Sequence, residues 1–106
     1  MSFNVRRAFA DVAAAQTDAV LVAAVPGSSI KVLGVAAQAA SATTLIFNSK
    51  PAGAGVAISA TFTGGVVLPE TENGDGWFET AIGEALTCTT GVGVATGIQL
   101  IFALRV

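Results

Sequence analysis

TGGVVLPETENGDGWFET, residues 63–80, is the stretch of this chain with the densest set of turn-forming residues. It also holds the only tryptophan and four of the seven acidic residues. Gly64-Gly65 predicts a turn into the short β-run Val66–Leu68, which Pro69 ends because proline cannot donate to a sheet ladder. Trp77–Thr80 predicts a second brief extended piece after a polar connection. The stretch therefore indicates strands joined by tight turns.

Short runs of Val, Ile, Ala and Thr flank this stretch on both sides, as is typical of strands. In residues 56–63, apolar and hydroxyl side chains alternate, which predicts one half-buried strand. Ile30–Ala37 is apolar on both faces, with Lys31, Leu33, Val35 and Ala37 on one face and Ile30, Val32 and Gly34 on the other. This pattern predicts a central strand that is covered on two sides. The remaining strands are expected at residues 8–15, 19–25, 43–48, 85–90 and 98–106.

Seven to nine short strands at regular spacing predict an all-β fold, either a β-sandwich or a barrel. Their number in a chain of this size favours a single-domain antiparallel β-sandwich. We expect jelly-roll-like wiring, although the spacing alone does not fix the topology. A chain of 106 residues has room for one core. We expect the sandwich to occupy residues 8–106, after an N-terminal arm over residues 1–7. This arm is either a frayed terminus or a segment that docks on a neighbouring molecule.

The composition is unusually poor in charge. Charged residues make up 11% and hydrophobic residues 53% of the chain, whereas ordinary soluble chains carry about 25% charged residues. Disorder is excluded, because it requires low hydrophobicity and high charge. The apolar segments 32–49 and 51–69 are interrupted by Gly, Pro, Ser or Thr, so no membrane-spanning helix is expected. Asp11 breaks the run after Arg6-Arg7, so no secretory signal is expected either. The surface is instead predicted to be covered by partners.

The formal charge of −2 and the scattered basic residues give no electrostatic footprint for nucleic acid. Cys88 is the single cysteine and cannot form an internal disulfide, which fits assembly in the cytosol. We expect it to be a small buried hydrophobe rather than a reactive thiol, since the chain has no histidine to activate it.

The residue types for catalysis are scarce. Histidine and tyrosine are absent, and no serine has a base for a triad, so we expect a protein without enzymatic activity or cofactor. Zinc is not expected without histidine and paired cysteines. Residues 70–76 offer oxygen ligands for calcium, but their spacing departs from the EF-hand pattern and favours a solvated polar hairpin.

Trp77 and Phe78 are adjacent in an extended piece, so their side chains are expected on opposite faces. One side chain can cap the core while the other points outward as a subunit contact. With calcium in the acidic loop, an outward Trp77 would also suit a carbohydrate-binding adhesin, which is an alternative function.

The chain resembles small virion proteins of tailed phages over residues 15–106. The resemblance lies in the strand Ala19–Val25 with its Pro/Gly-Ser turn and the following run Ile30–Leu33, in Gly65–Pro69, and most specifically in the run Gly76–Leu86. The acidic stretch Glu70–Asp75 departs from this pattern. Proteins of this kind are β-sandwiches described as capsid decoration (cement) proteins or as other structural proteins.

The resemblance implies a structural role in the virion, at the capsid surface. Such a protein binds the outside of the shell and clamps neighbouring major capsid protein subunits; a tail, neck or fibre component is an alternative. We also expect self-association, as a trimer. The residues expected at these contacts are Phe3, Arg6, Arg7, Trp77 and Phe78.

Overall fold

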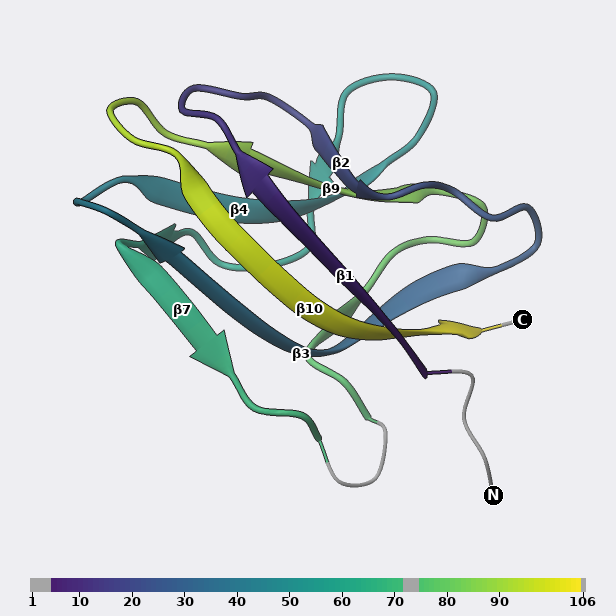
Figure 1. The fold of residues 1–106 in the computed structure, drawn as a ribbon. Coiled ribbons are helices and arrows are strands. Elements are labelled where there is room, and N and C mark those ends of the chain that lie inside the picture. Colours follow the sequence, from purple (N-terminus) through teal and green to yellow (C-terminus); the bar gives the residue numbers. More distant parts are fainter. Residues whose placement is uncertain (1–4, 72–74, 106) are drawn as a thin grey trace.

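The computed structural model describes residues 5–71 and 75–105. In this part of the chain, ten β-strands form two antiparallel sheets that pack face to face (Figure 1). Sheet 1 contains β1 (Val5–Val12), β10 (Thr96–Arg105), β3 (Ser29–Ala39) and β7 (Gly65–Leu68) in spatial order, with β8 (Phe78–Glu79) also paired to β3. Sheet 2 contains β2 (Ala19–Val22), β9 (Ala85–Thr90), β4 (Thr44–Lys50) and β5 (Val56–Ala57), with β6 (Phe62–Thr63) also paired to β4.

The wiring of the sheets is that of a jelly roll. β7 and β8 lie at opposite ends of the same edge of β3, and β5 and β6 share one edge of β4 in the same way. The ten strands thus fill four positions in each sheet. Counted over these eight positions, the chain crosses between the sheets at every step except the one from β4 to β5, as in a jelly roll. The predicted fold class, an antiparallel β-sandwich, is confirmed.

The core lies between the two sheets and takes side chains from both inner faces. Phe47 at its centre is fully buried, stacks on Phe78 with ring centroids 5.0 Å apart, and meets the edge of Phe62 at 6.3 Å. The other buried members are Val12, Ile30, Val32, Val35, Ala37, Leu45, Leu86, Cys88, Ile98, Leu100 and Phe102. In β10, every second residue from Ile98 to Phe102 faces this core, as its alternation predicts.

A β-bulge in β3 corrects the expected assignment of its faces. Ile101 pairs with Gly34 but Phe102 pairs with Val32, so Leu33 is an extra residue in the ladder. A bulge reverses the alternation of side chains beyond it. Val32 and Val35 therefore both face the core, whereas strict alternation had placed them on opposite faces.

The prediction of a single strand over residues 56–63 is wrong. β5 and β6 are two-residue strands, and the chain between them contains two more residues than the facing part of β4. The Ile58 amide donates to the Phe47 carbonyl at 2.9 Å, and the Phe47 amide donates to the Ser59 hydroxyl at 2.9 Å. This side-chain bond replaces a ladder bond and interrupts the strand.

The expected N-terminal arm is corrected over its last three residues. Val5, Arg6 and Arg7 belong to β1 and pair with β10, because β10 is long enough to accept eight partners along this edge. Residues 1–4, including Phe3, lie outside the described residues. The described residues include no helix that could cross a lipid bilayer.

Candidate functional site

The outer face of sheet 1 carries an exposed, mostly apolar row of residues that runs across four strands. Phe9 pairs with Gln99, Gln99 with Ala36, and Ala36 with Val67, so these four residues form one transverse line. The outer residues of this line are strongly exposed, with 84% of Phe9 and 75% of Val67 accessible. The two inner residues are Gln99 and Ala36, and the line is lowest at Ala36 because its side chain is small.

A second row lies beside the first on the same face. Arg7 pairs with Ile101, and Ile101 pairs with Gly34. The row ends at Glu70, because a Cβ at Gly34 would lie only 3.1 Å from the Glu70 amide nitrogen. Gly34 therefore lets the chain after β7 pass close to the sheet, which places Glu70 at the margin opposite Arg7.

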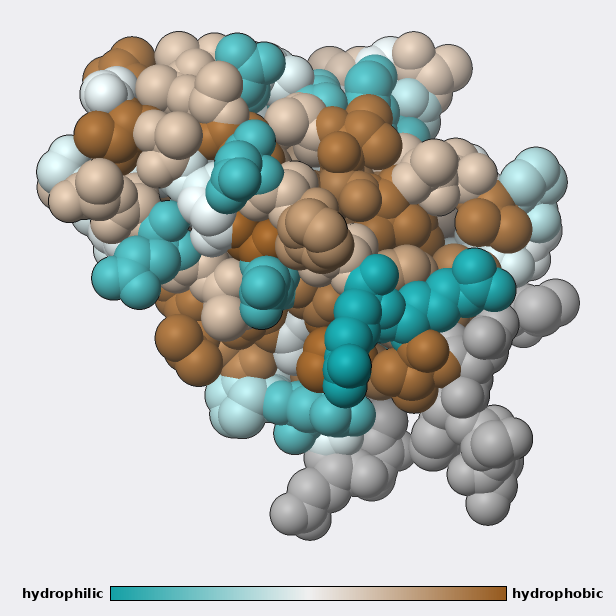
Figure 2. All heavy atoms as spheres, in the orientation of Figure 1, coloured by the Kyte–Doolittle hydropathy of each residue, from teal (hydrophilic) through white to brown (hydrophobic). Residues whose placement is uncertain are grey.

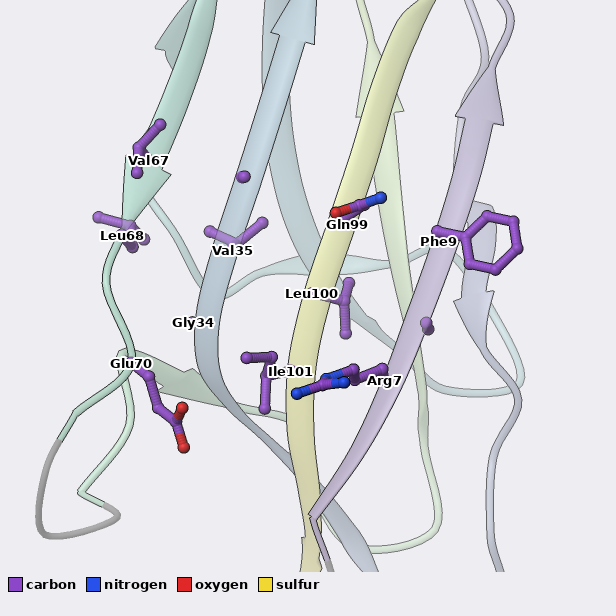
Figure 3. A pocket seen from close by; sticks show the side chains of 12 residues that line it. Arg7, Phe9, Gly34, Val35, Val67, Leu68, Glu70, Gln99, Leu100 and Ile101 are labelled. Carbon is purple, nitrogen blue, oxygen red and sulfur yellow. The ribbon is translucent and has the colours of Figure 1, made fainter.

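Together the two rows border an open groove of about 350 Å³ (Figure 3). Phe9 and Arg7 lie on one side of this groove and Val67 and Glu70 on the other, with Gly34 between them. Figure 2 shows apolar side chains over much of this face, with hydrophilic residues between them. Within the described part of the chain, the structure has no ion pair at Arg7 or Glu70.

A second apolar surface lies at the edge of the sandwich. Here β5 and β6 of sheet 2 and β7 and β8 of sheet 1 border the opening between the sheets. An open cleft of about 570 Å³ is lined here by Ala57, Ile58, Ser59, Ala60, Phe62, Leu68, Trp77 and Phe78. Trp77 is 46% exposed, and its indole Nε1–H donates to the Pro69 carbonyl at 2.8 Å. Its amide donates to the Val32 carbonyl at 2.8 Å, so both ends of this residue are fixed.

The predicted divergence of Trp77 and Phe78 is confirmed. Phe78 stacks on Phe47 at the core, whereas the Trp77 ring is half-exposed in the cleft. Among the other residues expected at contacts, Arg7 lies in the groove and Arg6 is exposed on the opposite side of β1. The structure thus separates Arg7 and Trp77 into two surfaces rather than one site.

From the sequence alone, we did not predict that Phe9, Val67 and Glu70 belong to one surface site. A signal for Phe9 was available, because Ala8, Ala10 and Val12 form the apolar face of β1 and leave Phe9 beside Arg7 on the other face. The alignment of Phe9 with Val67 carried no local signal, because it depends on the pairing of strands far apart in sequence.

Asp18 organises a polar cluster at one end of sheet 2. Its Oδ1 accepts from the Asn48 amide at 3.2 Å and from the Thr87 hydroxyl at 3.1 Å. Its Oδ2 accepts from the Gly55 amide at 3.0 Å. The cluster pins the loop after β4 to the turn before β2, which is a structural role.

The calcium hypothesis for residues 70–76 falls partly outside the described residues, because residues 72–74 are not among them. The described part of the loop is closed by the Gly76 amide, which donates to the Thr71 hydroxyl at 2.9 Å. In residues 5–71 and 75–105 there is no group of three or more acidic or thiol side chains that could hold a metal ion.

Cys88 is completely buried in the core, as predicted. Burial, with a smaller contribution from the Asp18 carboxylate, raises the pKa of the Cys88 thiol to about 11. The pKa is thus higher in the folded than in the unfolded chain. The thiol therefore contributes stability that is fully present below its ordinary pKa of 9.0 and is lost as the pH rises through about 11.

We expect the stability advantage of the wild type over Cys88→Ala to be constant between pH 7 and 8.5. This advantage should shrink by about 2 kcal/mol by pH 10.5. At that pH the thiol is ionised in the unfolded chain but still mostly protonated in the folded chain. Urea unfolding of both proteins across this pH range measures the difference. A stability advantage that does not change with pH would contradict the raised pKa of the Cys88 thiol.

The fold defines a small antiparallel β-sandwich protein of jelly-roll wiring with two exposed apolar surfaces. No protein-family model matches the chain, and no curated protein matches it.

Proposed function

We propose that this chain is a structural protein of a phage virion that binds the outside of the capsid and stabilises it without catalysis. The major capsid protein is its partner, and the Trp77 cleft is the contact surface. The proposal is supported by the resemblance over residues 15–106 and by a single observation in the structure. That observation is an exposed tryptophan whose backbone and indole N–H are both held in place at the margin of an apolar cleft.

The geometry of the cleft suits docking on a rigid protein surface. Interface energies are dominated by a few large side chains, with tryptophan prominent among them. Trp77 is held by its bonds to Pro69 and Val32, so it loses little conformational entropy when a partner covers it. Many copies on one shell add avidity that a single contact of this size lacks.

Trp77→Ala is expected to weaken binding to shells assembled from the major capsid protein of the same genome by roughly 30-fold or more, as for a hot-spot residue. Binding is measured by cosedimentation, and the melting temperature of the shell is measured with and without the protein. Val92→Ala is the matched control, because Val92 is 78% exposed in a loop outside the cleft.

Circular dichroism shows whether each variant is folded. The proposal fails if the wild type does not bind these shells. The proposal also fails if the wild type binds phage tails but not shells. Equal binding by both variants would remove the Trp77 cleft as the contact surface.

A further inference from the structure

We infer that the outer face of sheet 1 docks on the same face of a second copy of this chain. The twofold axis lies parallel to the strands, between β10 and β3. Such an interface is isologous, so each contact occurs twice. This inference does not rest on the proposed virion function, because it uses a different surface from the Trp77 cleft.

The order of the strands determines what this axis brings together. Since sheet 1 runs β1, β10, β3, β7, rotation about the axis places β1 over β7 of the second copy and β10 over its β3. In the first row, Phe9 then lies over Val67 of the second copy. In the second row, Arg7 lies over Glu70 of the second copy.

Charge complementarity selects this arrangement. Arg7 and Glu70 are the only charged residues of the two rows, they lie at opposite margins, and neither is in an ion pair within the described residues. The twofold axis along the strands forms two Arg7–Glu70 pairs between the copies. An axis across the strands would instead place Arg7 over Phe9 of the second copy and leave both charges without partners, which is costly.

Shape complementarity supports the same axis. The rotation places Ile101 over Gly34 of the second copy and Gln99 over its Ala36, so a large side chain meets a small one in both rows. Sheets that pack face to face lie about 10 Å apart with their side chains interdigitated. The groove between the raised margins provides the space for these side chains.

The area of this face is sufficient for a dimer. The four strands contain 8, 10, 11 and 4 residues. At about 3.3 Å per residue and about 4.8 Å between strands, they give a flat footprint of roughly 500 Å² per copy. A standard stable interface buries roughly 800 Å² of accessible surface per partner. The accessible surface follows every side chain, so it is larger than the flat footprint of the same face. The inference replaces the expected trimer with a twofold pair.

The test is sedimentation equilibrium of the purified chain between about 1 μM and about 1 mM. The wild type is expected to form dimers. Arg7→Glu and Glu70→Arg should each weaken dimerisation at least ~10-fold, because each places like charges opposite one another twice. An equimolar mixture of these two variants should restore the dimer, since every pair in the mixed dimer is then of opposite charge.

Arg6→Glu is the matched control, because it makes the same charge change on the same strand but away from the groove. Phe9→Ser is a second disrupting variant and should also give monomers, whereas Val20→Ser, at an exposed valine of sheet 2, should not. A monomeric wild type would overturn the inference. A trimeric wild type would also overturn it. The same holds if the mixture of the charge variants stays monomeric, or if Phe9→Ser still forms a dimer by pairing along the free edge of β1.

Discussion

Phe47→Ala is expected to lower the free energy of unfolding by about 3–5 kcal/mol, the range for removing a large buried aromatic side chain. Phe47 is inaccessible to solvent and contacts aromatic rings from both sheets, stacking on Phe78 of sheet 1 and meeting Phe62 of sheet 2 at its edge. The truncation leaves a cavity between the sheets that the surrounding β-ladders can close only in part. Urea unfolding, monitored by circular dichroism, measures the loss.

The matched control for this substitution is Phe9→Ala. Phe9 is 84% exposed, so its removal from the monomer should change the free energy of unfolding by no more than about 0.5 kcal/mol. Both variants are measured in dilute solution, because self-association would add apparent stability by mass action. Similar losses for Phe47→Ala and Phe9→Ala would contradict the placement of the core. A neutral Phe9→Ala would show that folding does not require Phe9, as expected for a residue at a contact surface.

Asp18→Ala is expected to lower the free energy of unfolding by roughly 2–4 kcal/mol. The substitution removes the acceptor for three donors, the Asn48 side-chain amide, the Thr87 hydroxyl and the Gly55 backbone amide. Thr87 is fully buried and Asn48 nearly so, so water cannot easily replace the lost carboxylate. Asp18 also has a φ of 53°, a conformation that aspartate adopts more readily than alanine.

Asp11→Ala, also measured in dilute solution, provides the control for this second prediction, because Asp11 is an exposed aspartate on the edge strand β1. It should change stability by no more than about 0.5 kcal/mol. Gly55→Ala should act in the same direction as Asp18→Ala, because its Cβ would overlap the Asp18 carboxylate and displace the loop after β4. If Asp18→Ala and Asp11→Ala were equally mild, the Asp18 cluster would not pin this loop.

Local patterns predicted the elements well where alternation was uninterrupted. β9 lies at the predicted residues, and the faces of β10 follow the predicted alternation from Ile98 to Phe102. Prediction failed at irregular pairing. Neither the extra residue Leu33 nor the break between β5 and β6 changes the local composition, because both arise from hydrogen bonds with distant strands.

The candidate surfaces divide in the same way. The divergence of Trp77 and Phe78 followed from their adjacency in an extended segment, since neighbouring side chains point to opposite faces. The alignment of Phe9 with Val67 required two intervening strands in the correct register. A shift of one residue in any of these pairings would have turned one side chain toward the core.

By itself, the sequence determined that this chain is a charge-poor β-sandwich with one core, because composition and two-residue periodicity act locally along the chain. Only the tertiary structure decided which exposed apolar residues lie together and that Arg7 and Glu70 face each other across one groove. The physical reason is that strand register is fixed by the packing of the whole core, whereas periodicity fixes only which side chains within a single strand share a face.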